Sequence, residues 1–487
     1  MNANTPVIIG VAQIQQRISD PLAGKEPIDL MVDAVQAAAV DAGNPGLLGS
    51  VDSVRVIRGA WRYKHPAGYV AEKVGCQGAE TVGTCFGGNM VQSTLNLSAA
   101  DILAGKRDLI VLTGAEVGYS QAKAAKAGIE LPVTETAGDY DFKLGKDEPM
   151  ACEAELAREI RQPIQMYPIF ENAIRHANGE SIEAHRDRVS TLWAGFSQVA
   201  SGNPDAWIKD AVDAETIRTP GQANRMVSFP YPKLMNSNNA VDMSAAIILC
   251  SVEKAKALGI SEDKWVYPWS GTDANDTYYV SERDNLYSSP AIRIAGSRAL
   301  ELAGLGVSDI DLVDVYSCFP SAVQVAAAEL DLSLQQPLTV TGGLTFGGGP
   351  LNNYVMHSIA RMVTLLRAAP GDRGLITANG GFLTKHAFGV YSTEPPARDY
   401  QYENLQAEVD QCPRRSWVTD HNGRVQVESY TVMFAGDKPV VGHAACLTDE
   451  GVRTWANTSD ADLVQEMMQR DFCDTAASID GQGNLRV

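Results

Sequence analysis

Residues 52–56 read Asp-Ser-Val-Arg-Val, and residues 311–315 read Asp-Leu-Val-Asp-Val. Each segment follows a helical stretch and precedes a Phe-Gly-Gly turn, at Phe86–Gly88 in the first half and at Phe346–Gly348 in the second. The matching positions lie about 260 residues apart throughout, and a constant offset across elements in the same order indicates a duplicated unit. We therefore predict two similar α/β halves that share a cleft, and we expect the function to lie in that cleft.

The first half shows the pattern of elements that we expect to be repeated. Val7–Ala12 is predicted as a buried strand and Ile28–Ala42 as an amphipathic helix that stops at Gly43. Asn89–Gly105 is predicted as a helix that begins directly after two glycines, and Leu109–Thr113 as the next strand. Short apolar strands that alternate with helices are typical of a largely parallel sheet.

The length and composition of the chain limit the kinds of protein that it can be. With 487 residues, two to four structural units are expected. A net charge of −19 argues against a nucleic-acid-binding surface, although a local pair such as Lys106-Arg107 could still hold a small anion. No apolar run is long enough to span a bilayer, and the N-terminus lacks a signal pattern. The eight cysteines show no paired metal-ligand spacing, so we expect reduced thiols and a cytoplasmic protein without metal.

Changes in composition divide the chain into four parts. Residues 1–120 are predicted to form the first α/β half, and residues 121–240 an inserted domain with two helices that forms one wall of the pocket. Residues 241–395 are predicted to form the second half, up to the Pro395-Pro396 pair. Residues 396–487 are predicted to form a small β-rich domain, because two alternating segments flank a Gly436 turn like a hairpin.

The duplication, the glycine turn before a helix and the order of several motifs resemble the thiolase superfamily. Within it, the chain resembles bacterial thiolase-like proteins, often labelled acetyl-CoA acetyltransferases, that carry an additional C-terminal domain. The resemblance implies an α/β thiolase fold, in which two βαβαβαββ units form five αβαβα layers, with an inserted loop domain and a C-terminal OB-like domain. The motifs that carry it are Tyr167-Pro-Ile-Phe-Glu-Asn-Ala173, Leu192-Trp-Ala-Gly-Phe-Ser197, Tyr316-Ser-Cys-Phe-Pro320 and Gly342-Gly-Leu-Thr-Phe-Gly-Gly-Gly-Pro-Leu-Asn-Asn353.

The usual catalytic residues of that superfamily are missing from the matching positions. Claisen chemistry needs a thiolate that carries the acyl group, a base and oxyanion donors. The resemblance places the nucleophilic cysteine at Gly88, the histidine of Gly-His-Pro at Gly349 and the second cysteine at Ala378. The standard two-cysteine thiolase cycle is therefore not encoded in this sequence.

Three residues remain as candidate catalytic groups. Tyr316 occupies the position of the family's oxyanion-site Asn or His, where a phenol can donate to a developing enolate; anchoring of two strands is the alternative. His386 follows the retained Gly380-Gly381 pair on the segment that returns past the cleft. Cys85 lies just upstream of the turn, and two interpretations are open: it carries an acyl group in the cleft, or it is a small buried thiol at a strand end. We assign Cys318 to packing.

The substrate-binding residues are predicted from a segment that matches the family's pantetheine-binding motif. It contains Asn236, Ser237, Asn238 and Asp242, and only Asp242 is identical to the family residue. Retained glycines permit close approach of the backbone to a ligand. The predicted glycine contacts are Gly88, Gly349, Gly380 and Gly381.

These features support three hypotheses about function. The first is an acyl-CoA enzyme of the acyltransferase or C–C bond class in lipid metabolism, one version being retro-aldol cleavage of a β-hydroxyacyl-CoA, which needs no nucleophilic cysteine. The second is acyl transfer through Cys85, and the third is a non-catalytic acyl-CoA-binding protein. In each case the ligand is acyl-CoA or another pantetheine thioester, and we expect no tightly bound cofactor. The resemblance also implies a possible homodimer that pairs through Thr81–Cys85.

Overall fold

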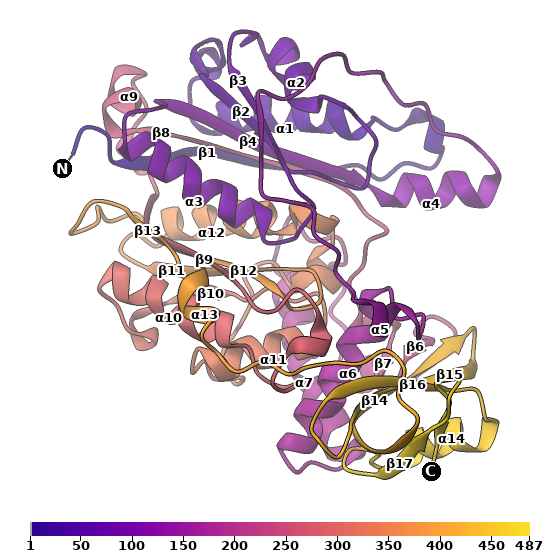
Figure 1. The fold of residues 1–487 in the computed structure, drawn as a ribbon. Helices are drawn as coiled ribbons and strands as arrows, with labels where there is room; N and C mark the ends of the chain where they lie inside the picture. The colour runs from indigo at the N-terminus through magenta and orange to yellow at the C-terminus, as the bar shows by residue number, and fades with distance from the viewer. Residues whose placement is uncertain (1) are drawn as a thin grey trace.

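The computed structural model describes residues 2–487, and Figure 1 shows two α/β layers stacked beside a smaller β-rich part. Within these residues the strands form three sheets. The first sheet has the order β1 (Pro6–Gln15), β8 (Asp242–Ser251), β4 (Leu109–Val117), β2 (Ser53–Val56), β3 (Glu80–Thr84) and β5 (Phe142–Leu144). The second has the order β10 (Leu312–Asp314), β11 (Arg373–Gly380), β12 (Lys385–Ser392), β9 (Tyr267–Asn275) and β13 (Gln401–Asn404).

The strand pairings confirm the duplication. In the first sheet β2 and β4 are parallel, whereas β8 runs antiparallel to both β4 and β1. In the second sheet β10 and β11 are parallel, whereas β12 runs antiparallel to both β11 and β9. Four strands therefore recur with the same neighbours and the same directions, as expected for two copies of one unit.

Helices complete five layers around the two sheets. α1 (Pro27–Asp41) packs on the outer face of the first sheet, and α10 (Pro290–Ala303) packs on the outer face of the second. Between the sheets lie α3 (Met90–Leu103) and α12 (Tyr354–Ala368), which contact strands of both sheets (Figure 1). A helix buried on nearly all sides fits such a central layer, and α3 even buries polar residues along its first two turns. The remaining helices of the two halves are α2 (Pro66–Val74), α9 (Val252–Ala257) and α11 (Pro320–Glu329).

The segment between the halves contributes to all parts of the molecule. Its elements are α4 (Gly118–Ala127), β5, α5 (Glu153–Leu156), α6 (Pro163–Ala177), α7 (Ile182–Ser201), α8 (Ala214–Arg218), β6 (Met226–Ser228) and β7 (Tyr231–Pro232). β5 extends the first sheet, and β6 pairs with the C-terminal sheet. The predicted division at residues 240 and 241 does not coincide with the division between the sheets, because β8 lies in the first sheet. A run of apolar residues identifies a buried strand but does not identify its sheet.

The C-terminal part is an antiparallel sheet with one helix, and it packs against α6. Its elements are β14 (Gly423–Ala435), β15 (Lys438–Leu447), β16 (Arg453–Thr458), α14 (Ala461–Gln469), β17 (Ala476–Ile479) and β18 (Leu485–Arg486), preceded by α13 (Gln406–Val409). The β14–β15 hairpin is formed as predicted. Asn172 on α6 donates a hydrogen bond to the Tyr430 carbonyl at 2.9 Å. β13 lies beyond the predicted boundary at residue 395 yet belongs to the second sheet. Among residues 2–487, no helix is long and apolar enough to cross a membrane.

Candidate functional site

A cavity of about 320 Å³ lies where the two halves meet the inserted segment. Three of its walls follow strands: Phe86–Gly88 comes after β3, Tyr316–Phe319 after β10, and Asn379–Gly381 at the end of β11. Ligands of open α/β sheets bind outside the carboxyl ends of the strands, so this position is the expected one. The segment between the halves supplies the fourth wall, with Gln162, Pro163, Ile164, Tyr167, Asn236, Ser237 and Asn239. We call this space the central cavity.

Gly88 and Tyr316 come from different halves and fit against each other in the central cavity. A Cβ atom built on Gly88 would lie within 3.0 Å of the Tyr316 hydroxyl and of the Asn379 carbonyl oxygen. Real Cβ atoms essentially never approach other heavy atoms so closely. The phenol therefore occupies the space that a side chain at position 88 would need.

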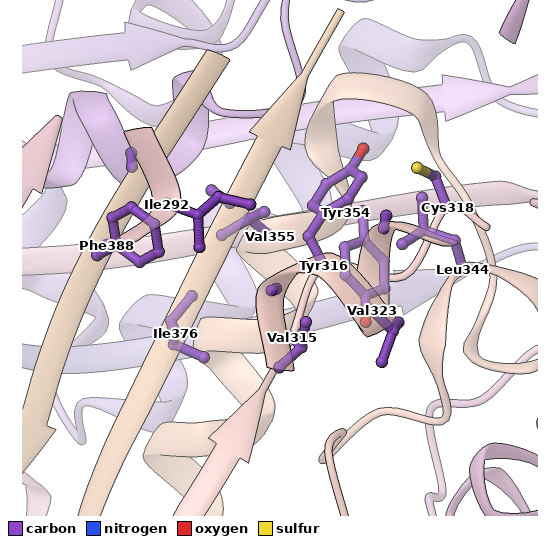
Figure 2. Packing of buried hydrophobic residues seen from close by; sticks show 14 of the residues in the cluster. Ile292, Val315, Tyr316, Cys318, Val323, Leu344, Tyr354, Val355, Ile376 and Phe388 are labelled. Atoms are coloured by element: carbon purple, nitrogen blue, oxygen red, sulfur yellow. The ribbon is translucent and has the colours of Figure 1, made fainter. Parts of the chain in front are cut away.

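Tyr316 is held in place by packing and by its own backbone. Its side chain is 8% exposed, and its ring meets the ring of Tyr354 edge-on, with centroids 5.5 Å apart. Figure 2 shows both tyrosines beside Cys318 and Leu344 within the buried cluster. The Tyr316 N–H donates to Thr377 Oγ1 at 3.0 Å. Burial raises the pKa of Tyr316 well above its usual value, with Cys318 and Tyr354 adding to the shift, so the phenol is a neutral hydrogen-bond donor.

A second polar group in the central cavity is centred on Tyr167. Its hydroxyl accepts from Asn379 Nδ2 and from the Leu383 N–H, both at 3.0 Å, and donates to the Gly381 carbonyl at 3.1 Å. Its ring stacks on Phe319, with centroids 4.5 Å apart. Tyr167 thereby fixes the glycine turn that follows β11.

Sequence reasoning did not identify Tyr167 or Asn379, although Tyr167 begins one of the motifs that carry the resemblance and Asn379 lies between the matched positions Ala378 and Gly380. Cys318, which we had assigned to packing, also lines the central cavity, with Asn379 Nδ2 at 3.8 Å from its sulfur. Burial raises the pKa of the Cys318 thiol to about 12. At neutral pH this group is therefore a thiol and not a thiolate nucleophile.

Two amide oxygens in the cavity wall have no hydrogen-bond partner within residues 2–487: Asn236 Oδ1 and Asn379 Oδ1. The nitrogen of each amide is used, since Asn236 Nδ2 donates to the Pro232 carbonyl at 2.8 Å and Asn379 Nδ2 donates to Tyr167. Buried polar atoms are nearly always paired in folded proteins. These oxygens therefore have acceptor capacity that the described residues do not use.

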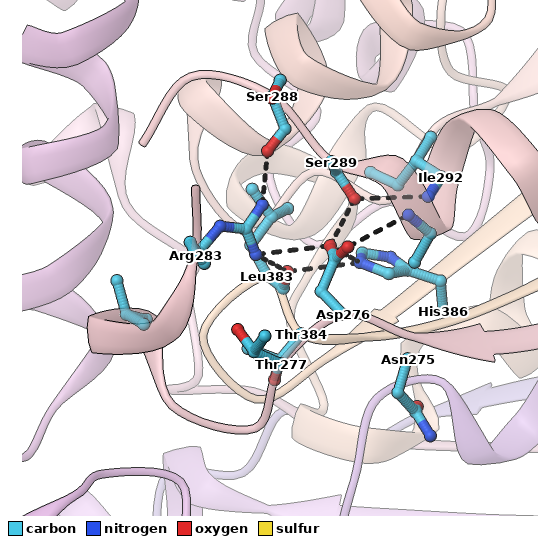
Figure 3. Close-up of polar contacts among 12 residues, drawn as sticks. Asn275, Asp276, Thr277, Arg283, Ser288, Ser289, Ile292, Leu383, Thr384 and His386 are labelled. Carbon is cyan, nitrogen blue, oxygen red and sulfur yellow. Dashed lines mark hydrogen bonds and ion pairs between the residues drawn. The ribbon is translucent and has the colours of Figure 1, made fainter. Parts of the chain in front are cut away.

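The structure does not bring all predicted catalytic residues together. Tyr316 lines the central cavity, whereas Cys85 and His386 do not. Cys85 lies on the other side of the Phe-Gly-Gly turn, with its sulfur 3.5 Å from the sulfur of Met90. His386 Nε2 lies 3.2 Å from the Leu383 carbonyl and 3.5 Å from Asp276, inside the network of Figure 3. Arg283 and His386 oppose the effect of burial and hold the pKa of Asp276 at about 2, so this network is a buried, charged support of the second half.

The predicted substrate-binding residues also divide into two groups. Those that line the central cavity are Gly88, Asn236, Ser237, Gly380 and Gly381. The others shape the loop before β8. Asp242 is fully buried and accepts from the Ser120 N–H at 3.0 Å. The Gly349 N–H donates to the Asn238 carbonyl at 3.0 Å, and a Cβ atom on Gly349 would collide with Ser237 Oγ.

One group of potential metal ligands occurs among residues 2–487: His176, Asp471 and Cys473, at the contact between α6 and the C-terminal sheet. Both ring nitrogens of His176 are engaged, by Asp471 at 2.9 Å and by Asp474 at 3.0 Å. These carboxylates outweigh the effect of burial and raise the pKa of His176. Both ring nitrogens of His176 are therefore already used by neighbouring carboxylates.

Comparisons with known proteins agree on one group of relatives. A family model described as the thiolase-like protein type 1 additional C-terminal domain matches residues 404–482. The crystal structure of a monomeric SCP2-thiolase-like protein type 1 from Mycobacterium smegmatis is 30% identical, covers 100% of this chain and 99% of that chain, and has a TM-score of 0.85. The peroxisomal thiolase of Saccharomyces cerevisiae is 14% identical over 81% of this chain and 98% of that chain, with a TM-score of 0.57.

Two curated archaeal proteins called acetyl-CoA acetyltransferase match shorter stretches. The Methanocaldococcus jannaschii protein is 30% identical over 18% of this chain, and the Methanothermobacter thermautotrophicus protein is 28% identical over 36% of it. The matches span only 22% and 48% of the length of these two relatives.

Proposed function

Because the chain belongs to the SCP2-thiolase-like proteins of type 1, within the thiolase superfamily, we propose that it binds an acyl-CoA or another pantetheine thioester in the central cavity. The observation that carries this proposal is the pairing of a buried, neutral donor with unused acceptors. Tyr316 offers its hydroxyl to the thioester carbonyl, and Asn236 Oδ1 and Asn379 Oδ1 can accept from the two amide N–H groups of pantetheine.

The chemistry of the cavity lining separates binding from thiolase catalysis. Among the described residues that line it, none is an Asp, Glu, His, Lys or Arg. The thiol of Cys318 stays protonated at neutral pH, and Gly88 has no room for a side chain. Without a thiolate and a base the cavity cannot run a Claisen cycle. We therefore propose a thioester-binding protein that uses a hydrogen bond from Tyr316 to hold the carbonyl.

Retro-aldol cleavage of a β-hydroxyacyl-CoA is the second candidate, favoured by the position of Tyr316. In that reaction the hydroxyl group loses its proton, the Cα–Cβ bond breaks, and the electron pair passes into the thioester enolate. Tyr316 supplies a donor for that enolate. The retro-aldol reaction is the second candidate and not the first, because the residues that line the central cavity include no carboxylate or imidazole that could take the hydroxyl proton.

Calorimetric titration with acetyl-CoA tests the binding proposal. We expect saturable binding, and we expect Tyr316→Phe to weaken it about fivefold, the effect of one hydrogen bond of about 1 kcal/mol. Tyr287→Phe is the matched control, because Tyr287 is exposed and its hydroxyl makes no contact given by the structure. Absence of binding to the natural protein, or equal affinity of Tyr316→Phe, would overturn the proposal.

Mass spectrometry separates binding from catalysis. After incubation with acetyl-CoA the intact protein is expected to keep its mass. Acylation of Cys85 or Cys318 would instead establish a transferase. After incubation with a β-hydroxyacyl-CoA, release of a shortened acyl-CoA together with an aldehyde or ketone would establish the retro-aldol reaction.

We also propose that the protein is a monomer and works in the cytoplasm. The edge strand β3, through which the sequence predicted a dimer, is covered by β5 of the same chain, with Val82 opposite Phe142. An edge strand that is already paired offers no free N–H and C=O row to a second subunit. All eight cysteines are free thiols, which suits a reducing compartment.

A further inference from the structure

A second, smaller cavity lies on the opposite side of the Phe-Gly-Gly turn from the central cavity. Its volume is about 190 Å³. It is bounded by the start of α3, by the strands β9 and β12, and by the segment after β5. The groups that matter here are Cys85, Asp273 and Lys385. We call it the Lys385 cavity; nothing in the proposed thioester site uses it.

Lys385 is a buried cation with unused hydrogen-bond donors. Its side chain is 6% exposed. Its Nζ donates to the Phe86 carbonyl at 3.3 Å and lies 6.0 Å from the ring centre of Tyr278. Within residues 2–487 it has no carboxylate oxygen within ion-pair distance. An ammonium carries three N–H groups, and a buried charge without a partner is costly. Lys385 therefore lacks a counter-charge.

The two nearby carboxylates are already engaged by other groups. Asp273 accepts hydrogen bonds from Ser93 Oγ and, at 3.3 Å, from Asn96 Nδ2. Asp147 accepts from the Phe86 N–H at 2.8 Å and pairs with Arg58 at 2.8 Å. These acceptors are used, whereas the donors of Lys385 are not, so the unused hydrogen-bonding capacity of the Lys385 cavity is that of an N–H donor and favours a ligand with an acceptor oxygen.

The thiol of Cys85 borders the same space. Its side chain is 7% exposed. Burial raises its pKa, and Lys385 is the strongest influence in the opposite direction, so the ammonium lies near enough to the sulfur to affect its charge. A molecule bound to Lys385 would therefore lie beside Cys85.

We propose that the Lys385 cavity is a binding site for a small monocarboxylate, held by the Lys385 ammonium next to the Cys85 thiol. One buried positive charge balances one negative charge, which favours a carboxylate over a dianionic phosphate. The volume limits the ligand to a short chain. The site is separate from the proposed thioester site, so it stands even if acetyl-CoA fails to bind.

Two alkylating reagents that differ only in charge test this site through Cys85. Iodoacetate carries a carboxylate, and iodoacetamide is its neutral counterpart. In either reaction the Cys85 sulfur forms a bond to the CH₂ carbon, the C–I bond breaks and iodide leaves, while the thiol proton passes to the buffer. The rate at each cysteine is measured by peptide mass spectrometry, with the partly exposed Cys412 as internal reference.

We expect the iodoacetate-to-iodoacetamide rate ratio at Cys85 to exceed the ratio at Cys412 by about tenfold or more. Lys385→Met, which keeps the shape of the side chain without its charge, should abolish that preference. Lys146→Met is the matched control, because Lys146 lines the same cavity but is exposed; it should keep the preference. An equal ratio at both cysteines, or a preference that survives Lys385→Met, would overturn the proposal.

A second measurement decides the case in which Cys85 reacts with neither reagent. Binding to the folded state alone raises the unfolding temperature. Sodium acetate should therefore raise the unfolding temperature of the natural protein relative to sodium chloride of equal ionic strength. Lys385→Met should remove this difference, and the absence of any difference in the natural protein would refute the site.

Discussion

Restoring the family nucleophile is the perturbation that tests the architecture of the central cavity most directly. Gly88→Cys places a Cβ atom within 3.0 Å of two oxygens, the Tyr316 hydroxyl and the Asn379 carbonyl. The first belongs to a buried ring packed against Tyr354, and the second belongs to the backbone of β11. Neither can move freely, so we expect Gly88→Cys to destabilise the protein by about 1–3 kcal/mol, the range measured for overpacked cores.

The assay is chemical or thermal unfolding of Gly88→Cys. The control is a Gly→Cys change at a position where a Cβ atom meets no other atom. Gly195 lies on an exposed face of α7 and has no heavy atom within 4 Å of its ideal Cβ position. Gly195→Cys should therefore be neutral or slightly stabilising, since glycine is unfavourable inside helices. Adding Tyr316→Phe to Gly88→Cys should recover part of the loss, because it removes the hydroxyl nearest the new Cβ atom and keeps the ring packed on Tyr354. A Gly88→Cys protein as stable as the natural one and acylated by acetyl-CoA would refute the reasoning.

Three further predictions concern stability and assembly. Burial raises the pKa of Glu116 to about 7, although the hydrogen bond from the Ala60 N–H acts in the opposite direction. Because this pKa lies above the unfolded value, the free energy of unfolding falls as the pH rises from about 4.5 to 7. Glu116→Gln should therefore raise the free energy of unfolding by on the order of 3 kcal/mol at pH 8 and leave it unchanged at pH 4, as measured by urea titration. Tyr167→Phe removes the oxygen that accepts hydrogen bonds from Asn379 and Leu383. It should lower the free energy of unfolding by about 1–3 kcal/mol, and an unchanged unfolding midpoint would show that Tyr167 does not stabilise the glycine turn. Replacing residues 142–144 by Gly-Ser-Gly should expose β3 and cause self-association detectable by light scattering, and a strictly monomeric product would contradict the covering role of β5.

The fold was predictable because its signals are local and occur twice. Helices such as Ile28–Ala42 and strands such as Leu109–Thr113 follow from hydrophobic period and glycine stops, and the structure has them at Pro27–Asp41 and Leu109–Val117. The constant offset of about 260 residues between matching elements then predicted that the second half has the same fold as the first. The sheet to which β8 belongs was not predictable, since its uniformly buried run fits either sheet.

The positions of Cys85 and His386 were not predictable, because they depend on side-chain direction. In a strand, neighbouring side chains point to opposite faces. Lys385 and His386 are adjacent in β12, yet Lys385 borders the cavity beside Cys85 and the ring of His386 reaches Asp276 (Figure 3). A shift of one residue in the expected register exchanges these two side chains. The sequence distance to a glycine motif therefore could not determine which of them reaches Cys85 and which reaches Asp276.

Gly88 and Tyr316 are best understood as one paired feature and not as two separate losses. They lie in different halves, and the contact between them exists only because the halves face each other. With tyrosine at 316, a side chain at 88 is excluded by steric overlap. With glycine at 88, the tyrosine hydroxyl has room at the point where the resemblance places the nucleophile. Replacing Tyr316 alone does not open position 88 to a side chain, because the backbone carbonyl of Asn379 would still collide with a Cβ atom there. The hydroxyl of Tyr316 is consequently the side-chain group that occupies this position in the central cavity.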